Sequence, residues 1–291
     1  MKLDYISARG DVLPLVNNKY FYLVELGGQT EANTDISSVV IGGIDGDIPN
    51  NVQAQPRTII LTLRINPSEN VEEAKRQILK VVKLKHNGSL VWEQKERTVR
   101  IEGVVEAVEM PRWNNAVAMQ ITIHCGQPFW EDAENVIQEI NEAINLHYFT
   151  DVQGDMLYFP ESGIPLGEYD FLRLKDFQNN GDVDVGMEIE IIAYETVTNP
   201  VLTDIYGDFF GVGYGTGSKK VTMQAGDIIR INTNKGKKSV VLNGTTNLLD
   251  KVKPQSTWLQ LRAGDNQYSI DSDDESTTNM SFNLVFKQRY I

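Results

Sequence analysis

Residues 121–140, ITIHCGQPFWEDAENVIQEI, contain the point where one apolar pattern ends and another begins. Over residues 117–124, apolar side chains alternate with polar or small ones, which is the two-residue period of a half-buried strand. That strand must end at residues 126–128, because proline cannot donate to a strand ladder and glycine frees the backbone to turn. Beyond Trp130 the apolar residues take the spacing of one helical face: Val136, Ile137, Ile140 and Ile144. The sequence therefore predicts a strand that leaves one core and a linker helix, residues 132–147, that leads to a second core.

Length and composition indicate a globular protein with two domains. The 291 residues suffice for two cores, and 41% hydrophobic and 23% charged residues are globular values. A formal net charge of -13 argues against nucleic acid as a specific partner, since an acidic surface repels phosphate. The same charge disfavours adsorption to anionic membranes.

Cysteine usage and sorting signals narrow the possibilities further. The single cysteine, Cys125, cannot form an intrachain disulfide and cannot build a thiolate zinc site within one chain. The N-terminus MKLDYISARGDVLPL lacks the apolar core of a signal peptide, and no later run is long enough to span a bilayer. We therefore expect synthesis in the cytoplasm and no membrane insertion.

Residues 1–131 are predicted to form a first domain of strands and one helix. The expected strands cover residues 20–26, 38–42, 57–65, 90–92, 97–108 and 116–124. Asn70 occupies an N-cap position three residues before Glu73, and the apolar stripe that follows predicts an amphipathic helix packed on the sheet. The glycine- and aspartate-rich residues 42–47 predict an ordered loop with positive φ angles. One helix with several antiparallel strands indicates an α+β or open-barrel unit.

Residues 148–291 are predicted to form a second, almost wholly β domain. The expected strands cover residues 183–193, 220–223, 228–232, 239–242, 258–261, 268–270 and 280–290. Turns rich in glycine, asparagine and aspartate separate them. Many short strands with polar turns indicate a two-sheet sandwich.

Three stretches that could carry chemistry each have a simpler structural explanation. The glycine run GVGYGTGSKK, which begins at Gly211, lacks P-loop spacing and a following helix, so a surface loop is favoured over a phosphate site. His124 adjoins Cys125, but neighbours on a strand point to opposite faces, so buried strand-end residues are favoured over a catalytic dyad. The acidic run DSDDES, which begins at Asp271, lacks the glycine turn and distal glutamate of an EF-hand loop, so a solvated hairpin tip is favoured over a calcium site.

The tryptophans are the remaining candidates. Trp92, Trp113, Trp130 and Trp258 could stack on a sugar, but each lies beside strand-like apolar residues, which favours packing in a core or an interface. We therefore assign no catalytic, cofactor-binding or metal-ligating residue and expect no cofactor.

Three motifs, taken in order, resemble those of a known family. The first is residues 40–47 (VIGGIDGD), followed by the 57–65 strand and the single helix. The second is residues 124–130 (HCGQPFW), a strand end with a proline and an aromatic before the linker. The third is a series of strands and turns in the C-terminal half, with GDII from Gly226, VVLNG from Val240, WLQL from Trp258 and GDN from Gly264. Over nearly its whole length the chain resembles the distal tail (Dit) proteins of long-tailed bacteriophages.

The resemblance implies a mainly β (α+β) fold, with an N-terminal tail-tube-like barrel or sheet, one packed helix, a linker helix and a C-terminal galectin-like β-sandwich. It also implies a homo-oligomeric ring, usually of six subunits, that forms the baseplate hub at the virion tail tip. Such a ring would contact the tail tube protein and the tip proteins, which include tail-associated lysins and receptor-binding proteins. The galactoside-binding residues of galectins have no counterpart here, so sugar binding is not implied.

Physical arguments agree with a ring. Strand edges left exposed in a monomer invite aggregation, and pairing with the next copy removes that hazard. A channel lined by carboxylates would repel DNA phosphates and let a genome slide without adsorbing.

Other functions stay open at this point. The C-terminal sandwich could be a carbohydrate-binding module that recognises a host surface glycan. A β-sandwich hydrolase ranks lower, because no nucleophile, metal set or acid pair stands out. The equivalent hub of a prophage-derived tail-like particle would use the same part, and sequence does not separate it from a virion hub.

Overall fold

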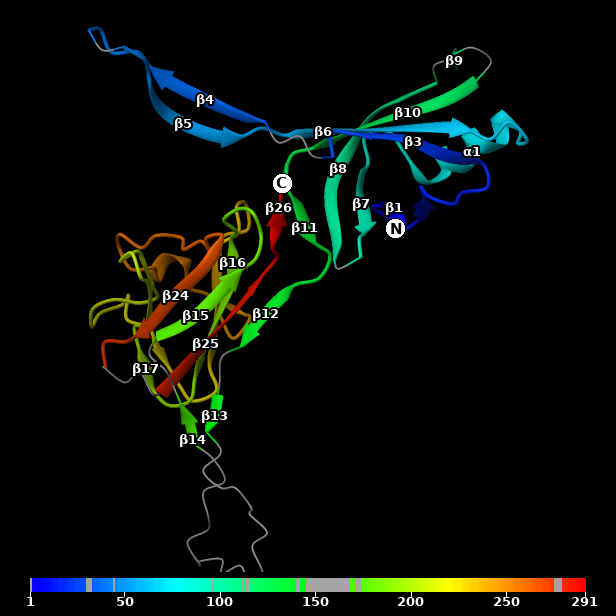
Figure 1. The fold of residues 1–291 in the computed structure, drawn as a ribbon. Coiled ribbons are helices and arrows are strands. Elements are labelled where there is room, and N and C mark those ends of the chain that lie inside the picture. The colour runs from blue at the N-terminus through cyan, green and yellow to red at the C-terminus, as the bar shows by residue number, and fades with distance from the viewer. Residues whose placement is uncertain are drawn as a thin grey trace, which may run out of the picture. The chain divides into compact units, whose positions relative to one another are not determined.

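A computed structural model gives the fold and describes residues 2–29, 33–43, 45–95, 97–110, 112–113, 116–139, 142–144, 168–170, 174–274 and 279–291 (Figure 1). The described chain is mainly β with one α-helix, which confirms the predicted fold class. Its contacts divide it into two compact units. Unit 1 comprises Met1–Glu134 together with Arg289–Ile291, and unit 2 comprises Asn135–Gln288.

Unit 1 is built on one open antiparallel sheet. Its main path runs in the order β2-β1-β7-β8-β10-β6-β3, and β9, β11 and β26 pair onto it. The strands are β1 (Lys2–Ser7), β2 (Val12–Pro14), β3 (Phe21–Gly27), β6 (Arg57–Ile65), β7 (Asn87–Glu93), β8 (Thr98–Glu109), β9 (Arg112–Trp113), β10 (Ala116–Cys125), β11 (Trp130–Asp132) and β26 (Arg289–Tyr290). Because β2 and β3 end the path, the sheet does not close into a barrel.

The core of unit 1 follows from the alternation in its strands. In β6, Ile59, Leu61 and Leu63 are buried, while Thr58 and Arg64 face solvent. Helix α1 (Val71–Val81) covers this core with its buried residues Ala74 and Ile78. The helix begins where the Asn70 side chain accepts hydrogen bonds from the backbone of Glu72 and Glu73, as the sequence predicted. Within the described residues, no helix is long and apolar enough to cross a membrane.

Two strands of unit 1 stand outside the main sheet. They are β4 (Thr34–Val39) and β5 (Ile48–Ala54), which pair only with each other among the described strands. We call residues 34–54 the arm. The sequence predicted a strand at 38–42 instead, so the hairpin begins earlier than its apolar pattern suggested.

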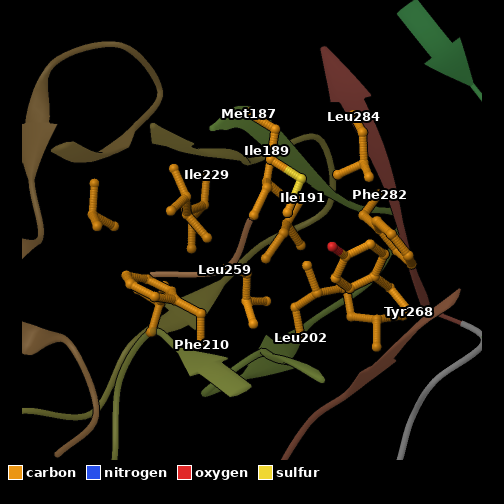
Figure 2. Close-up of a cluster of buried hydrophobic side chains, with 14 of the residues drawn as sticks. Met187, Ile189, Ile191, Leu202, Phe210, Ile229, Leu259, Tyr268, Phe282 and Leu284 are labelled. Carbon is orange, nitrogen blue, oxygen red and sulfur yellow. The ribbon is translucent and has the colours of Figure 1, made fainter. Parts of the chain in front are cut away.

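Unit 2 is a two-sheet sandwich around a single core. One sheet has the order β12-β25-β16-β21-β22-β23 and the other β15-β24-β18-β19. Their strands are β12 (Val136–Glu139), β15 (Leu174–Asn179), β16 (Met187–Ala193), β18 (Val201–Asp204), β19 (Phe209–Gly211), β21 (Ile228–Asn232), β22 (Ser239–Leu242), β23 (Thr246–Asn247), β24 (Gly264–Asp271) and β25 (Met280–Phe286). Figure 2 shows side chains from both sheets, including Ile189 and Leu202, converging on this core.

Three smaller elements complete unit 2. Short pairs join β13 (Glu142–Ile144) to β14 (Glu168–Asp170) and β17 (Val197–Thr198) to β20 (Thr222–Met223). A 3-10 turn, η1, spans Leu249–Lys251. The predicted strand at 258–261 is absent, and only Leu261 makes a bridge there, to Val185.

The predicted linker helix over residues 132–147 is wrong. The described part of this stretch contains strands β12 and β13, and β12 lies along β25 with Val136 opposite Phe286. Val136 packs against the core of unit 2, whereas Ile137 is exposed, so the stretch alternates as a strand does. Both residues are β-branched and favour strands, and the edge of β25 supplies hydrogen bonds that an isolated helix would lack.

The C-terminal residues return to unit 1, which the sequence did not predict. The expected strand at 280–290 is split into β25, in unit 2, and β26, in unit 1. In β26, Arg289 and Tyr290 lie opposite Glu131 and Trp130 of β11. The predicted second domain of residues 148–291 therefore extends past the end of unit 2.

Candidate assembly surface

The arm exposes every residue of both its strands to solvent. Two apolar pairs lie directly across the hairpin, Ile36 opposite Val52 and Val39 opposite Ile48, on either side of an irregularity at Ser37/Ser38. Ile36 and Val52 are 59% and 60% exposed. A two-stranded hairpin alone is at best marginally stable in water. Uncovered apolar pairs on such a hairpin are therefore typical of a surface that another molecule covers.

The tip of the arm carries the first family motif. Residues 40–47 connect β4 to β5, and within them Gly43 and Gly46 have φ angles of +89° and +95°. The predicted loop with positive φ angles is therefore confirmed at these two glycines. Val40 is 76% exposed and Ile41 is also exposed, so the tip adds to the apolar surface of the arm.

The root of the arm is the place where the hairpin joins the main sheet, at residues 28–29, 33 and 55–57. Close packing and hydrogen bonds hold the backbone there. Gly28 has a φ of +75°, and a Cβ atom there would lie 2.1 Å from the carbonyl oxygen of Thr58, so only glycine fits. At the base of the hairpin, the Gln55 backbone N–H donates to the Asn33 carbonyl oxygen at 2.8 Å. The Gln29 carbonyl oxygen accepts hydrogen bonds from Arg57 and from Trp130.

The main sheet of unit 1 has two uncovered edges. Among the described strands, β2 pairs only with β1, and β3 pairs only with β6. Tyr22 and Val24 on β3 are exposed apolar residues, and the register of β3 shifts between Leu23 and Glu25. An edge strand with unused hydrogen-bonding groups can pair with a second chain.

The glycine run of unit 2 is a structural loop. Asn199, buried and in the left-handed region, donates to the carbonyl oxygen of Gly215 and accepts from the backbone N–H of Val221. A Cβ atom at Gly213 would lie 2.2 Å from the Asn199 side-chain oxygen. These contacts explain Gly213 by close packing, and the sequence contained no signal that singled out Asn199.

His124 and Cys125 point to different environments, as expected for neighbours on a strand. The Cys125 thiol is fully buried, and burial raises its pKa to about 11 against the opposing effect of the Arg57 charge. His124 is exposed, so the prediction that both residues are buried is wrong for the histidine. Gly103 lies on the neighbouring strand β8, where a Cβ atom would be 2.8 Å from the Cys125 sulfur, and this close packing explains the burial of the thiol.

The acidic run at Asp271 supplies no described cation site. The Asp273 carboxylate accepts a hydrogen bond from the Asn199 side chain at 2.5 Å. The Asp273 backbone N–H donates to the Thr198 carbonyl oxygen. Within the described residues, no group of three or more His, Cys, Asp or Glu side chains is placed to hold a metal ion. Glu275 lies outside the described residues.

The tryptophans pack on cores, as predicted, in the three cases where the side chain is described. Trp130 meets Trp92 edge to face, with ring centroids 5.9 Å apart, in the core of unit 1. Trp258 packs on Phe210 of the unit 2 core, with ring centroids 4.8 Å apart. The Lys238 ammonium lies over the Trp258 ring. Because these contacts occupy its ring, Trp258 is not a free platform for a sugar. The side chain of Trp113 lies outside the described part of the chain.

Sequence comparison relates residues of the C-terminal half to a known protein family. Residues 180–290 match a family described as "Siphovirus-type tail component, C-terminal domain". Over these residues the chain is similar to the siphovirus-type tail components. This match confirms the resemblance predicted from the sequence and supports a structural role in a phage tail. A comparison with curated proteins found no match.

Solved structures extend the likeness to the whole chain. The chain is similar to SPP1 Dit (gp 19.1), described as a paradigm of the hub adsorption apparatus in Gram-positive infecting phages, with a TM-score of 0.68. The sequences are 12% identical, and the match covers 99% of both chains, so the likeness concerns the fold. Two structures of the phage P2 baseplate in its activated conformation, with Ca and with Sr, match at 14% identity with TM-scores of 0.48 and 0.47. Each match covers 99% of this chain and 97% of the other.

Proposed function

We propose that this chain is the subunit of a distal tail hub whose unit 1 joins neighbouring copies into a ring. The exposed arm carries this proposal, because it presents two apolar cross-strand pairs that remain exposed among the described residues. The uncovered edges β2 and β3 offer the complementary feature, a place where a neighbouring copy can add strands.

A contact between an arm and a different surface of the next copy is heterologous. Heterologous contacts close into rings when the rotation between copies divides the circle evenly, and otherwise form filaments. A ring of six would agree with the family resemblance and would leave a central channel for DNA. The net charge of -13 suits such a channel, because an acidic wall does not adsorb phosphate.

Burial of the arm contributes to the driving force for assembly. Covering an exposed Val or Ile side chain contributes roughly 1.5–3 kcal/mol. The two cross-strand pairs of one arm contain four such side chains, and each subunit of a ring contributes one arm. The favourable free energy from covering one arm is therefore gained once for each subunit of the ring.

Unit 2 acts in this proposal as the part that joins the tail to its tip proteins. Its core is filled by side chains from both sheets. The loop of the glycine run, which was considered as a phosphate site, is held by hydrogen bonds to Asn199 that stabilise the fold. We assign it a binding and structural role with no catalytic step, on a galectin-like sandwich. The location that follows is the tip of the virion tail.

The proposal is tested by the mass and shape of particles formed by the purified full chain. Light scattering and negative-stain imaging should show a ring with a central hole. The variant carrying Ile36→Asp and Val52→Asp places two charges in the proposed contact and should shift the population to monomers by more than tenfold. Ser37→Asp, which lies between the apolar pairs, is the matched control for added charge on the arm.

Two results would contradict the proposal. One is a chain that stays monomeric at high concentration both alone and with its tail tube protein. The other is a ring whose mass is unchanged in the Ile36→Asp, Val52→Asp variant. Circular dichroism should show the same folded spectrum for all variants, since both positions are exposed.

A further inference from the structure

The root of the arm is fixed by a shared acceptor, the backbone carbonyl oxygen of Gln29. Arg57 Nη1 donates to it at 2.8 Å, and Trp130 Nε1 donates to it at 3.1 Å. Gln29 lies two residues after the end of β3, and Arg57 begins β6, so both belong to the segments from which the arm leaves and returns. Trp130 is different, because it lies about a hundred residues further along the chain.

Trp130 is a rigid donor. Its side chain is 3% exposed and meets Trp92 edge to face in the core of unit 1. Loss of its acceptor would leave the Trp130 indole N–H buried and unpaired, which carries a desolvation penalty. The carbonyl oxygen of Gln29 is therefore held at the position that the tryptophan ring dictates.

Trp130 is in turn positioned by the last strand of the sequence. It begins β11, where it lies opposite Tyr290 of β26. The Arg289 guanidinium donates to the Glu131 carboxylate through Nε at 2.8 Å and lies at the same distance through Nη2. The two side chains are partly buried, at 22% and 28% exposed, and the contact is a charge-assisted hydrogen bond, which is stronger than a neutral one.

We infer that β26 positions the root of the arm through Trp130. The order of contact is Arg289 to Glu131 within the β11–β26 pair, Trp130 to the Gln29 carbonyl, and the Gln29 carbonyl to Arg57, which lies two residues after Gln55 at the base of the hairpin. Residues 289–290 therefore control a hairpin that begins some 250 residues earlier in the sequence. The importance of this control for ring formation rests on the proposed function, whereas the contact path itself does not.

The inference predicts a change at a distant backbone hydrogen bond. The Gln55 N–H bond to the Asn33 carbonyl oxygen closes the arm at its base, and its opening is measured by amide hydrogen exchange. In Arg289→Ala, which lacks the contact to Glu131, the Gln55 amide should exchange about tenfold faster than in the original chain. Arg230→Ala is the matched control, because it removes a comparable arginine–carboxylate contact, to Glu190 in unit 2.

A second pair of variants isolates the indole hydrogen bond. Trp130→Phe keeps an aromatic ring in the core but removes the donor to Gln29, and it should also speed exchange at Gln55 about tenfold. Trp92→Phe is its control, because the Trp92 Nε1 has no hydrogen-bond partner among the described residues. Removing that N–H leaves the root of the arm unchanged and should leave exchange at Gln55 unchanged.

The outcomes separate this inference from ring formation. Exchange is measured at a dilution where light scattering shows monomers, so it reports on the root of the arm whether or not rings form. Faster exchange at Gln55 in Arg289→Ala and Trp130→Phe, with both controls unchanged, supports the inference. Faster exchange confined to β11 and β26, with Gln55 unaffected, overturns it even if the chain forms rings.

Discussion

Strands β16 and β5 have the same length and opposite burial. Each contains seven residues, but β16 alternates buried and half-buried positions, whereas all of β5 is exposed. The second sheet of the sandwich covers Ile189 and Ile191 of β16, whereas Ile48 and Val52 of β5 are 53% and 60% exposed among the described residues. The comparison teaches that an apolar strand residue stabilises the fold only where a second layer meets it. We propose that a neighbouring copy supplies this layer for the arm.

The largest expected effect comes from removing a side chain between the two sheets of unit 2. Phe282 is fully buried and tilts against Phe177 at 5.5 Å. Phe282→Ala should lower the free energy of unfolding by about 3–5 kcal/mol, because it loses apolar burial and leaves a cavity. Denaturant titration monitored by circular dichroism measures this change. A loss below about 1 kcal/mol would mean that the second sheet does not stabilise β25 as described.

A glycine pair compares the root of the arm with its tip. Gly28→Ala should lower the free energy of unfolding of unit 1 by about 2–4 kcal/mol, because a positive φ and a clash with the Thr58 carbonyl oxygen add together. Gly46→Ala has a positive φ but no atom within 4 Å of its Cβ, so it should cost only about 1–2 kcal/mol. Thermal unfolding of both variants checks the difference. Equal losses would show that the root is no more constrained than the tip.

A buried lysine gives a smaller, pH-dependent effect. Lys175 is 4% exposed and lies over the Phe282 ring, and burial lowers its pKa from 10.5 to about 8. Between pH 8 and 10.5 the unfolded chain binds this proton and the folded chain does not, so the free energy of unfolding should rise with pH in that window. Lys175→Met should abolish the contribution of this group to the rise, as measured by denaturant titration at pH 7.5 and 10. Lys237→Met, at an exposed position, should retain the full rise of the free energy of unfolding with pH.

The smallest expected effect is on the arm itself. In the monomer, Ile36→Ala should change the free energy of unfolding by less than about 0.5 kcal/mol, because the side chain is already in water. The same substitution should weaken assembly, since it removes apolar area from the proposed contact. Sedimentation at several concentrations measures the second effect. A large loss of monomer stability would instead show that the arm is covered within its own chain.

Sequence patterns predicted the elements whose two faces differ clearly. Strand β6 matches its predicted bounds because its apolar residues alternate without interruption, and α1 begins at its Asn70 cap. Strands β21 and β22 also match, because polar turns flank them on both sides. In each case, local preference and tertiary packing agree.

The predictions failed where packing partners come from far along the chain. Residues 136–144 have apolar spacings compatible with a helix, but residues 136–139 pair with the edge of β25, about 150 residues later, and residues 142–144 pair with β14. The arm was missed as a hairpin because its apolar residues face no core, so they give no buried face to read. The hydrogen bond between Trp130 and Gln29 was likewise invisible, since a backbone acceptor has no sequence signature.

The pairing of β11 with β26 gives unit 2 the topology of an insertion. Glu131 and Arg289 lie opposite each other in antiparallel register, so the chain leaves unit 1 and re-enters it at neighbouring points. A segment whose two ends adjoin can be exchanged for another with little rerouting of the host domain. The architecture thus allows unit 2 to be exchanged as one block while the sheet of unit 1 keeps its strand order.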